Sequence, residues 1–156
     1  MGCLVKLKRV SLCGDVSRQT TWELNMHRPV DREQFHIVEQ MIHSLRVINN
    51  NFIVIAFTPA IQNASYIQIT LNNKNDYYIE LHFEIPCVFS YRFEGKKGMR
   101  KHPWTQYAFH AKTANEASQI FKEVLCYGCL PNLSNWKNCT SKTYKEGLKQ
   151  KRIIKI

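Results

Sequence analysis

Three side chains that could do chemistry share one face of a predicted strand. Glu80, His82 and Glu84 alternate with apolar residues, and alternate side chains of a strand point to the same face of its sheet. Two carboxylates beside an imidazole could bind a divalent metal or carry out acid–base catalysis, and His110 on a later strand could join them. The solvent-facing side of many strands carries such residues, so a hydrolase or metal site here ranks third among three hypotheses for the function.

A second group is the C-x-x-C sequence of Cys126 and Cys129, with Cys139 ten residues further on. Structural zinc usually requires two such pairs. A redox-active pair is favoured at a helix N-terminus, where the helix dipole lowers the pKa of the thiol, whereas this pair falls at the C-terminus of a predicted helix. We therefore expect thiols here and no metal. Because the first residues lack the apolar core of an export signal, all the cysteines are expected to be thiols, namely Cys3, Cys13, Cys87, Cys126, Cys129 and Cys139.

Other catalytic signatures are missing from the sequence. The glycines at 95 and 98 flank lysines without a following helix, unlike those of a phosphate-binding loop, and no serine stands in a nucleophile elbow. We predict no catalytic residue, no bound metal and no cofactor, and we expect a binding protein rather than an enzyme.

Positive charge is concentrated in two segments. The chain has 22 Lys and Arg against 12 Asp and Glu, a net charge of +10. Residues 95–102 hold four positive charges and no negative one, and residues 141–156 have a net charge of +5, so the two segments hold nine of the ten. Localised positive charge favours an acidic partner, either a protein surface or a nucleic acid, although a solvated surface would have the same composition.

The basic loop, residues 95–104, is predicted to contact that partner. Its lysines and Arg100 would pair with carboxylates or phosphates, and Trp104 would fill a pocket or stack on a base, unless it folds back into the core. The tail is expected to contribute its own basic residues. The predicted binding residues are Lys96, Lys97, Arg100, Lys101, His102, Trp104, Lys149, Lys151 and Arg152.

Two amphipathic helices are predicted. The first has Asp31 as N-cap and ends at 49–51, and its apolar stripe is Phe35, Val38, Met41, Ile42 and Leu45. The second has Thr113 as N-cap, Glu116 in the capping-box position and Gly128 as a left-handed C-cap. Its apolar stripe is Ala117, Ile120, Phe121, Val124 and Leu125.

Between the helices the apolar period changes to two, which is typical of strands. Strands are predicted over 52–57, 66–71, 77–85, 89–93 and 104–111, with weaker ones over 4–12 and 21–26. The first of these is apolar throughout, as in a strand covered on both faces. This order predicts an α+β fold, with an antiparallel sheet of about five to seven strands packed by two helices. We expect one domain over 1–140 and a basic C-terminal tail over 141–156 that could order only on binding.

Part of the chain, residues 66–136, resembles small bacterial immunity-type proteins. The shared features are Tyr66-Ile67-Gln68, Tyr78-Ile79-Glu80, a helix containing Ile120-Phe121, the following Gly128 and a closing Trp136. The resemblance implies a non-enzymatic protein that binds a cognate toxin and blocks its active site. Immunity proteins against nucleases are usually acidic because their partners are basic, so the basic charge of this chain points to an acidic toxin instead.

Three functional hypotheses follow. The first is a non-enzymatic binding protein of the immunity or inhibitor type, which engages an acidic macromolecular partner through the basic loop and tail. The second is a nucleic-acid-binding module that uses the same residues, and binding of that kind should weaken steeply with salt. The third is the hydrolase or metal site described above. No apolar run approaches the length of about 20 residues needed to span a bilayer, and a cytoplasmic location is expected.

Overall fold

A computed structural model describes residues 6–10, 19–24, 30–31, 35–47 and 52–154. Within these ranges the elements follow in the order β1 (Lys6–Val10), β2 (Gln19–Leu24), β3 (Val30–Asp31), α1 (Phe35–His43), β4 (Phe52–Ile61), β5 (Ala64–Asn73), β6 (Asp76–Phe83), β7 (Cys87–Phe93), β8 (Lys96–His102), β9 (Thr105–Ala111), α2 (Ala114–Tyr127), a 3-10 turn (Leu133–Asn135), β10 (Lys137–Asn138) and α3 (Thr140–Ile154).

The main sheet has the strand order β10-β9-β6-β5-β4-β2-β1-β3 in the described part of the chain. Neighbouring strands are antiparallel except β1 and β3, which are parallel. The predicted α+β class with an antiparallel sheet is confirmed. Two of the eight strands, β3 and β10, are only two residues long and are too short to leave a pattern in the sequence.

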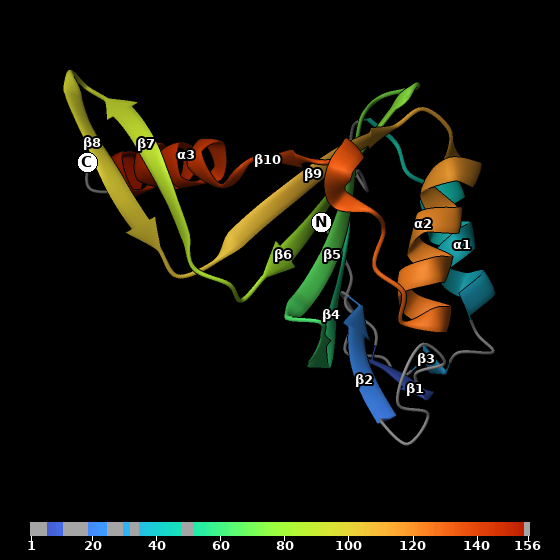
Figure 1. The fold of residues 1–156 in the computed structure, drawn as a ribbon. Coiled ribbons are helices and arrows are strands. Elements are labelled where there is room, and N and C mark those ends of the chain that lie inside the picture. Colours follow the sequence, from blue (N-terminus) through green and yellow to red (C-terminus); the bar gives the residue numbers. More distant parts are fainter. Residues whose placement is uncertain (1–5, 11–18, 25–29, 32–34, 48–51, 155–156) are drawn as a thin grey trace.

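Helices α1 and α2 cover one face of this sheet (Figure 1). The buried face of the strands and the apolar stripes of the helices form one core, with Ile55, Ile67, Ile79 and Phe121 fully enclosed. Helix α2 has the predicted caps: Thr113 accepts a hydrogen bond from the backbone N–H of Glu116, and Gly128 is left-handed with φ 63°. These local signals hold because capping depends on residues close in sequence.

Helix α1 begins later than predicted. Asp31 is not its N-cap, because Asp31 lies in β3, where it pairs with Lys8 of β1, and the helix starts at Phe35. Its stripe is as expected, since Phe35, Val38 and Ile42 are buried. The helix ends at His43 and residues 44–47 are not helical, so the helix also ends earlier than predicted; the predicted end at 49–51 itself lies outside the described residues.

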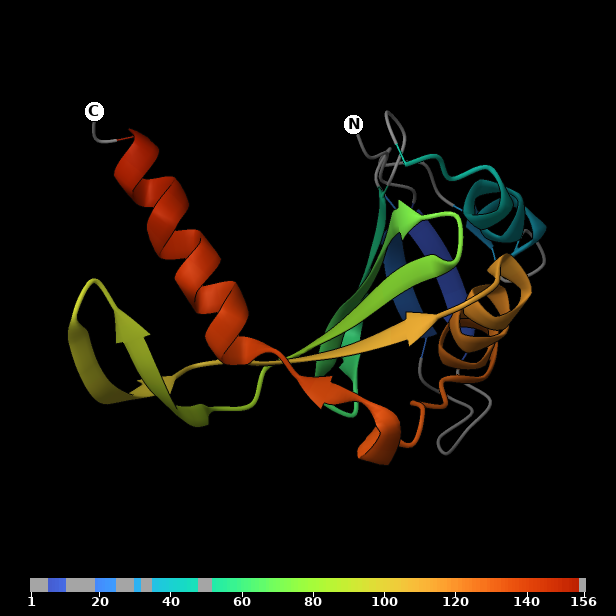
Figure 2. The same ribbon diagram turned by 90° about the horizontal axis from the view of Figure 1, so that it is seen from above.

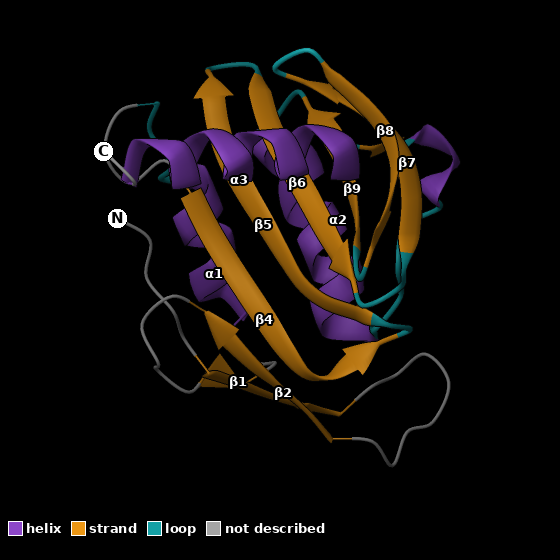
Figure 3. Cartoon of the chain, turned by 90° about the vertical axis from the view of Figure 1, so that its left-hand side faces the viewer, coloured by secondary structure: helices purple, strands orange, loops and turns teal. Residues whose placement is uncertain are grey.

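Strand β4 is covered on one face rather than on two. Its side chains alternate, with Ile53, Ile55 and Phe57 buried while Phe52 is 37% exposed. Both helices of the core lie on the same side of the sheet, and the opposite face of β4, β5 and β6 is turned toward α3 (Figure 3). That second face carries the polar side chains of β5 and β6, such as Gln68 and Glu80, whereas on β4 it carries Phe52 and Val54.

The β7–β8 hairpin and helix α3 together project from one end of the sheet (Figure 2), and we call them the arm. The segment predicted as a basic loop is strand β8, which pairs with β7 around a two-residue turn at Glu94 (φ 54°) and Gly95 (φ 76°). Positive φ at both central residues is the pattern of a type I′ hairpin turn. The segment predicted as a basic tail is helical through Ile154.

The start of α3 is fixed to the sheet. Asn138 accepts hydrogen bonds from the backbone N–H and the hydroxyl of Thr140, at 3.1 and 2.6 Å. The Thr140 hydroxyl in turn accepts from the backbone N–H of Gln106 on β9, at 2.9 Å, and the Cys139 N–H donates to the Gln106 carbonyl at 2.9 Å. These contacts set the position from which α3 leaves the sheet.

Candidate functional site

Both oxygens of the Glu80 carboxylate accept hydrogen bonds from neighbouring side chains. The amide of Gln68 donates to its Oε1 at 3.0 Å, and the amide of Gln106 donates to its Oε2 at 2.7 Å. The thiol of Cys139 lies 3.8 Å from the same Oε2. A carboxylate whose two oxygens already accept hydrogen bonds is held in place, which suits a structural role better than proton transfer to a substrate.

His82 belongs to the same network and is 8% exposed. Its Nδ1 lies 2.8 Å from Oε1 of Gln106, and its Nε2 lies 3.3 Å from Oε1 of Glu84. The ring stacks on Tyr66 with centroids 4.5 Å apart. Burial raises the pKa of Tyr66, so its hydroxyl stays neutral. On the face that the sequence suggested as a hydrolase site, the polar side chains are therefore paired with one another.

Two other residues considered for chemistry, His110 and Cys139, have partners of their own. The Nδ1 of His110 lies 2.6 Å from Oδ1 of Asp76, and the ring does not contact His82. Burial, and then the charge of Glu80, raise the pKa of the Cys139 thiol, so this thiol stays protonated and is a poor nucleophile. Among the described residues no group of three or more His, Cys, Asp and Glu side chains is arranged to hold a metal.

The cysteine prediction is partly wrong. Cys87, Cys126 and Cys139 are outside any disulfide, as expected, but Cys129 is disulfide-bonded; Cys3 and Cys13 lie outside the described residues. Cys126 is buried in the last turn of α2. The C-x-x-C sequence therefore does not present two thiolates to a metal.

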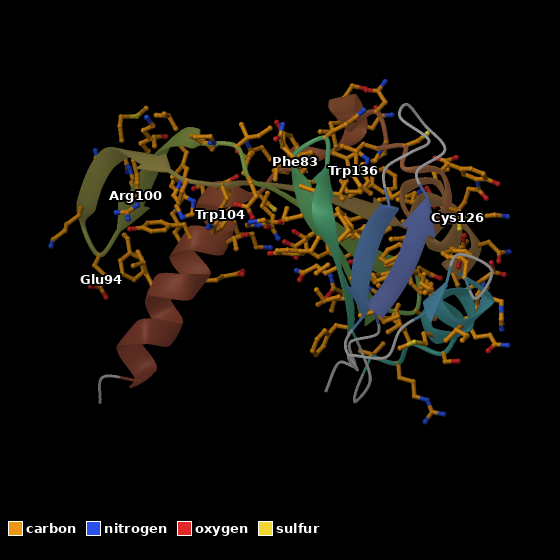
Figure 4. All side chains as sticks on the ribbon, turned by 90° about the horizontal axis from the view of Figure 1, so that it is seen from below. Phe83, Glu94, Arg100, Trp104, Cys126 and Trp136 are labelled. Atoms are coloured by element: carbon orange, nitrogen blue, oxygen red, sulfur yellow. The ribbon has the colours of Figure 1, made fainter. Side chains whose placement is uncertain are left out.

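A chain of aromatic rings connects the polar face of the sheet to the arm. The ring of His82 lies 4.9 Å from that of Trp104, and Trp104 lies edge-on to His102 at 4.0 Å. His102 in turn lies 5.8 Å from Tyr144 of α3 and 6.0 Å from Phe89 of β7. Figure 4 shows Trp104 between Arg100, on the arm, and the side chains of the sheet. We call this group of contacting rings the joint; it consists of His82, Trp104, His102, Tyr144 and Phe89.

Two of the predicted binding residues belong to the joint rather than to the surface. His102 is only 8% exposed, and burial lowers its pKa. Trp104 is half-buried against the two histidines. The alternative considered for Trp104, that it folds inward, describes its position better than a ring free to stack on a base.

The arm brings together the two basic segments of the sequence. The guanidinium of Arg100 lies 4.6 Å above the ring of Tyr144, so the hairpin is bound to α3. Residues 87–102 hold five basic residues and Glu94, and α3 holds five and Glu146, which gives each a net charge of +4. The arm therefore carries eight of the ten net positive charges of the chain.

One face of the hairpin is exposed and mixed in character. Directly paired residues of an antiparallel hairpin point to the same side. Three pairs form this outer face: Val88 with Lys101, Ser90 with Met99, and Arg92 with Lys97. Val88 is 60% exposed and Met99 is 71% exposed, so two apolar side chains stand in solvent among three cationic ones.

The remaining predicted residues are distributed over the arm. Lys96, Lys97 and Lys101 are exposed on β8, whereas Lys149, Lys151 and Arg152 lie near the end of α3 and their side chains are not among those described. The sequence prediction did not include Val88 and Arg92. The alternation of Phe89, Tyr91 and Phe93 could have indicated them, because it places residues 88, 90 and 92 on the opposite face.

Comparisons of the chain with protein-family models, with curated proteins and with solved structures find no match. The described part of the chain also contains no helix with the length and apolar character that crossing a membrane requires.

Proposed function

We propose that this chain is a non-enzymatic binding protein whose arm engages the acidic surface of a partner protein. The observation that carries the proposal is the union of the hairpin and α3, distant in sequence, into one projecting unit with a net charge of +8. Charge concentrated in this way steers an oppositely charged partner toward one part of the molecule.

The outer face of the hairpin favours a protein over a nucleic acid. Interfaces between proteins have an apolar centre with a polar rim, and methionine is enriched in them. Met99 and Val88 supply exposed apolar area, and Lys101, Lys97 and Arg92 surround it. Binding to single-stranded nucleic acid depends on rings that can stack on bases, whereas Trp104 and Tyr144 are packed against other side chains of this chain.

An inhibitory role is part of the proposal. The resemblance of residues 66–136 to immunity-type proteins supports a partner that is a toxin, which would be neutralised when the arm covers its active site. The hydrogen bonds of Glu80 and His82 also support binding rather than catalysis, because the polar atoms of both side chains already have partners within the chain.

The proposal is tested with a matched pair of triple variants. The arm variant combines Lys96→Gln, Met99→Ser and Lys101→Gln, all at exposed positions. The control variant combines Val47→Ser, Lys112→Gln and Lys122→Gln, which removes the same charge and one exposed apolar side chain from the body. Exposed substitutions of this kind change stability by less than about 0.5 kcal/mol.

Tagged wild-type and variant proteins are incubated with nuclease-treated extract of the cells that express the chain. We expect an acidic protein to be retained by the wild type and the control but not by the arm variant. Retention of that protein by all three would contradict the proposal. Retention of nucleic acid alone, in a parallel experiment with untreated extract, would contradict it as well.

A further inference from the structure

Three cationic side chains line a hollow that joins part of the outer face of the hairpin to Lys145 of α3. The hollow measures about 440 Å³ and is lined by Ser90 and Arg92 of β7, Lys97 and Gly98 of β8, and Lys145 of α3. Arg92 and Lys97 lie directly opposite each other on the two strands of the hairpin. The third cation comes from a segment almost fifty residues later in the chain.

The charge of this hollow is not balanced within the described residues. None of the side chains that line it is acidic, and neither Arg92, Lys97 nor Lys145 forms an ion pair there. Like charges gathered at one place repel each other, and an anion between them relieves the repulsion. The geometry of the cations is set by the hairpin register and by the packing of α3 on the hairpin through Phe89 and Tyr144.

A second hollow shows the contrast. It measures about 290 Å³, lies between α3 and the polar face of the sheet, and is lined by Glu80 and Glu146 as well as His110 and Lys142. Its lining combines acidic and basic groups, so it does not present positive charge alone. Only the first of these two hollows presents cations alone.

We propose that the hollow of Arg92, Lys97 and Lys145 binds clustered carboxylates on an acidic segment of the partner protein. This inference rests on the proposed function and identifies where the partner's negative charge is held. Three cations can neutralise more than one carboxylate, the open volume admits several side chains, and Arg92 can bind a carboxylate through two parallel hydrogen bonds. A second copy of this chain is a poor occupant because each copy carries +10.

The probe is a short fluorescent polyglutamate peptide, and the measurement is its anisotropy at about 50 mM salt, where charge interactions between exposed groups are weakly screened. The hollow variant combines Arg92→Gln and Lys145→Gln. The control combines Lys112→Gln and Lys122→Gln, which removes the same charge from exposed positions on the body. Circular dichroism and a thermal melt check that each variant is folded.

The hollow variant should bind the peptide about ten-fold more weakly than the wild type, and the control less than about two-fold more weakly. Equal losses in the two variants would overturn the inference, because binding would then follow net charge rather than this site. A fluorescent oligothymidylate that binds more tightly than the peptide, and that depends on the same two residues, would also overturn it in favour of a nucleic acid.

The failure of this inference is distinguishable from failure of the proposed function. If the hollow variant retains the peptide but the arm variant of Lys96, Met99 and Lys101 loses the captured protein, the arm binds the partner without the hollow. If both variants keep their ligands, neither the hollow nor the outer face of the hairpin is the binding site.

Discussion

His102 of β8 packs edge-on against Trp104, with ring centroids 4.0 Å apart, and its Nδ1 lies 3.4 Å from the backbone nitrogen of Trp104. This pair lies where the chain passes from the arm into the main sheet. The ring of Trp104 also contacts His82 on the sheet, and His102 contacts Tyr144 on α3. The orientation of the arm relative to the sheet therefore depends on a few aromatic contacts.

Removing the indole should loosen the arm. We expect Trp104→Ala to lower the free energy of unfolding by about 2 kcal/mol, less than for a fully buried tryptophan, because Trp104 is half-buried. Proteolysis should become faster within residues 87–102. Trp104→Phe keeps a ring at the same place and serves as the control; equal proteolysis of both variants would show that the joint does not position the hairpin.

The stability of the joint should fall in acid. Burial lowers the pKa of His102, and the charge of Arg100 and the neighbouring His82 lower it further, against a hydrogen bond with the Trp104 backbone that raises it. The folded protein then binds this proton less readily than the unfolded chain. The stabilisation that comes from keeping His102 neutral in the folded protein is complete above the pKa of histidine in the unfolded chain, about 6.5. It is lost as the pH falls toward the lower pKa of His102 in the folded protein.

Thermal melts between about pH 7.5 and 5.5 check this expectation. The melting temperature should decrease with acid in the wild type, and His102→Gln should reduce the decrease. An unchanged slope in the variant would mean that other groups cause the pH dependence.

Glu80 should contribute stability rather than activity. In the wild type, both carboxylate oxygens of Glu80 accept hydrogen bonds from the side-chain amides of Gln68 and Gln106. In Glu80→Gln one of these oxygens is replaced by an NH2 group, which would face one of those two donors and could not accept its hydrogen bond. We expect a loss of about 1–3 kcal/mol in urea unfolding, the cost of leaving a buried hydrogen bond unmade. Glu84→Gln is the control, since that side chain is 59% exposed, and it should cost less than about 0.5 kcal/mol. A smaller loss at position 80 than at position 84 would contradict the structural role.

Two glycines of the arm should respond to alanine in opposite ways. Gly95 has φ 76°, a conformation that alanine adopts at a cost of about 1 kcal/mol. Gly147 lies in α3 with nothing within 4 Å of an added Cβ, and alanine should stabilise the helix by about 1 kcal/mol. Hydrogen exchange of the arm amides measures both effects. A stabilising Gly95→Ala would be incompatible with the turn described here.

The sequence predicts best what is decided locally. The caps of α2 at Thr113 and Gly128, and the alternation that buries Ile67 and Ile79, depend on neighbours within a few residues, and both are confirmed. The Asp31 cap is wrong because a pairing with Lys8, more than twenty residues earlier, places Asp31 in a strand. Such pairings leave no local pattern.

The arm could be predicted only in part. The positive charge of both segments was visible, but strand β8 has no apolar alternation, and its structure comes from pairing with β7. The union with α3 depends on Arg100 and Phe89 meeting Tyr144, more than forty residues later. The same distance explains why Trp104 and His102 were assigned to the surface, since the rings that cover them come from other elements.

The most direct test of the central claim is hydrogen exchange of the protein alone and in complex with its captured partner. We predict protection of amides in residues 87–102 and in α3, and little change in α1 and α2, which lie on the opposite face of the sheet (Figure 1). Protection confined to the main sheet or to α1 and α2 would contradict the account, because the partner would then bind a surface other than the arm.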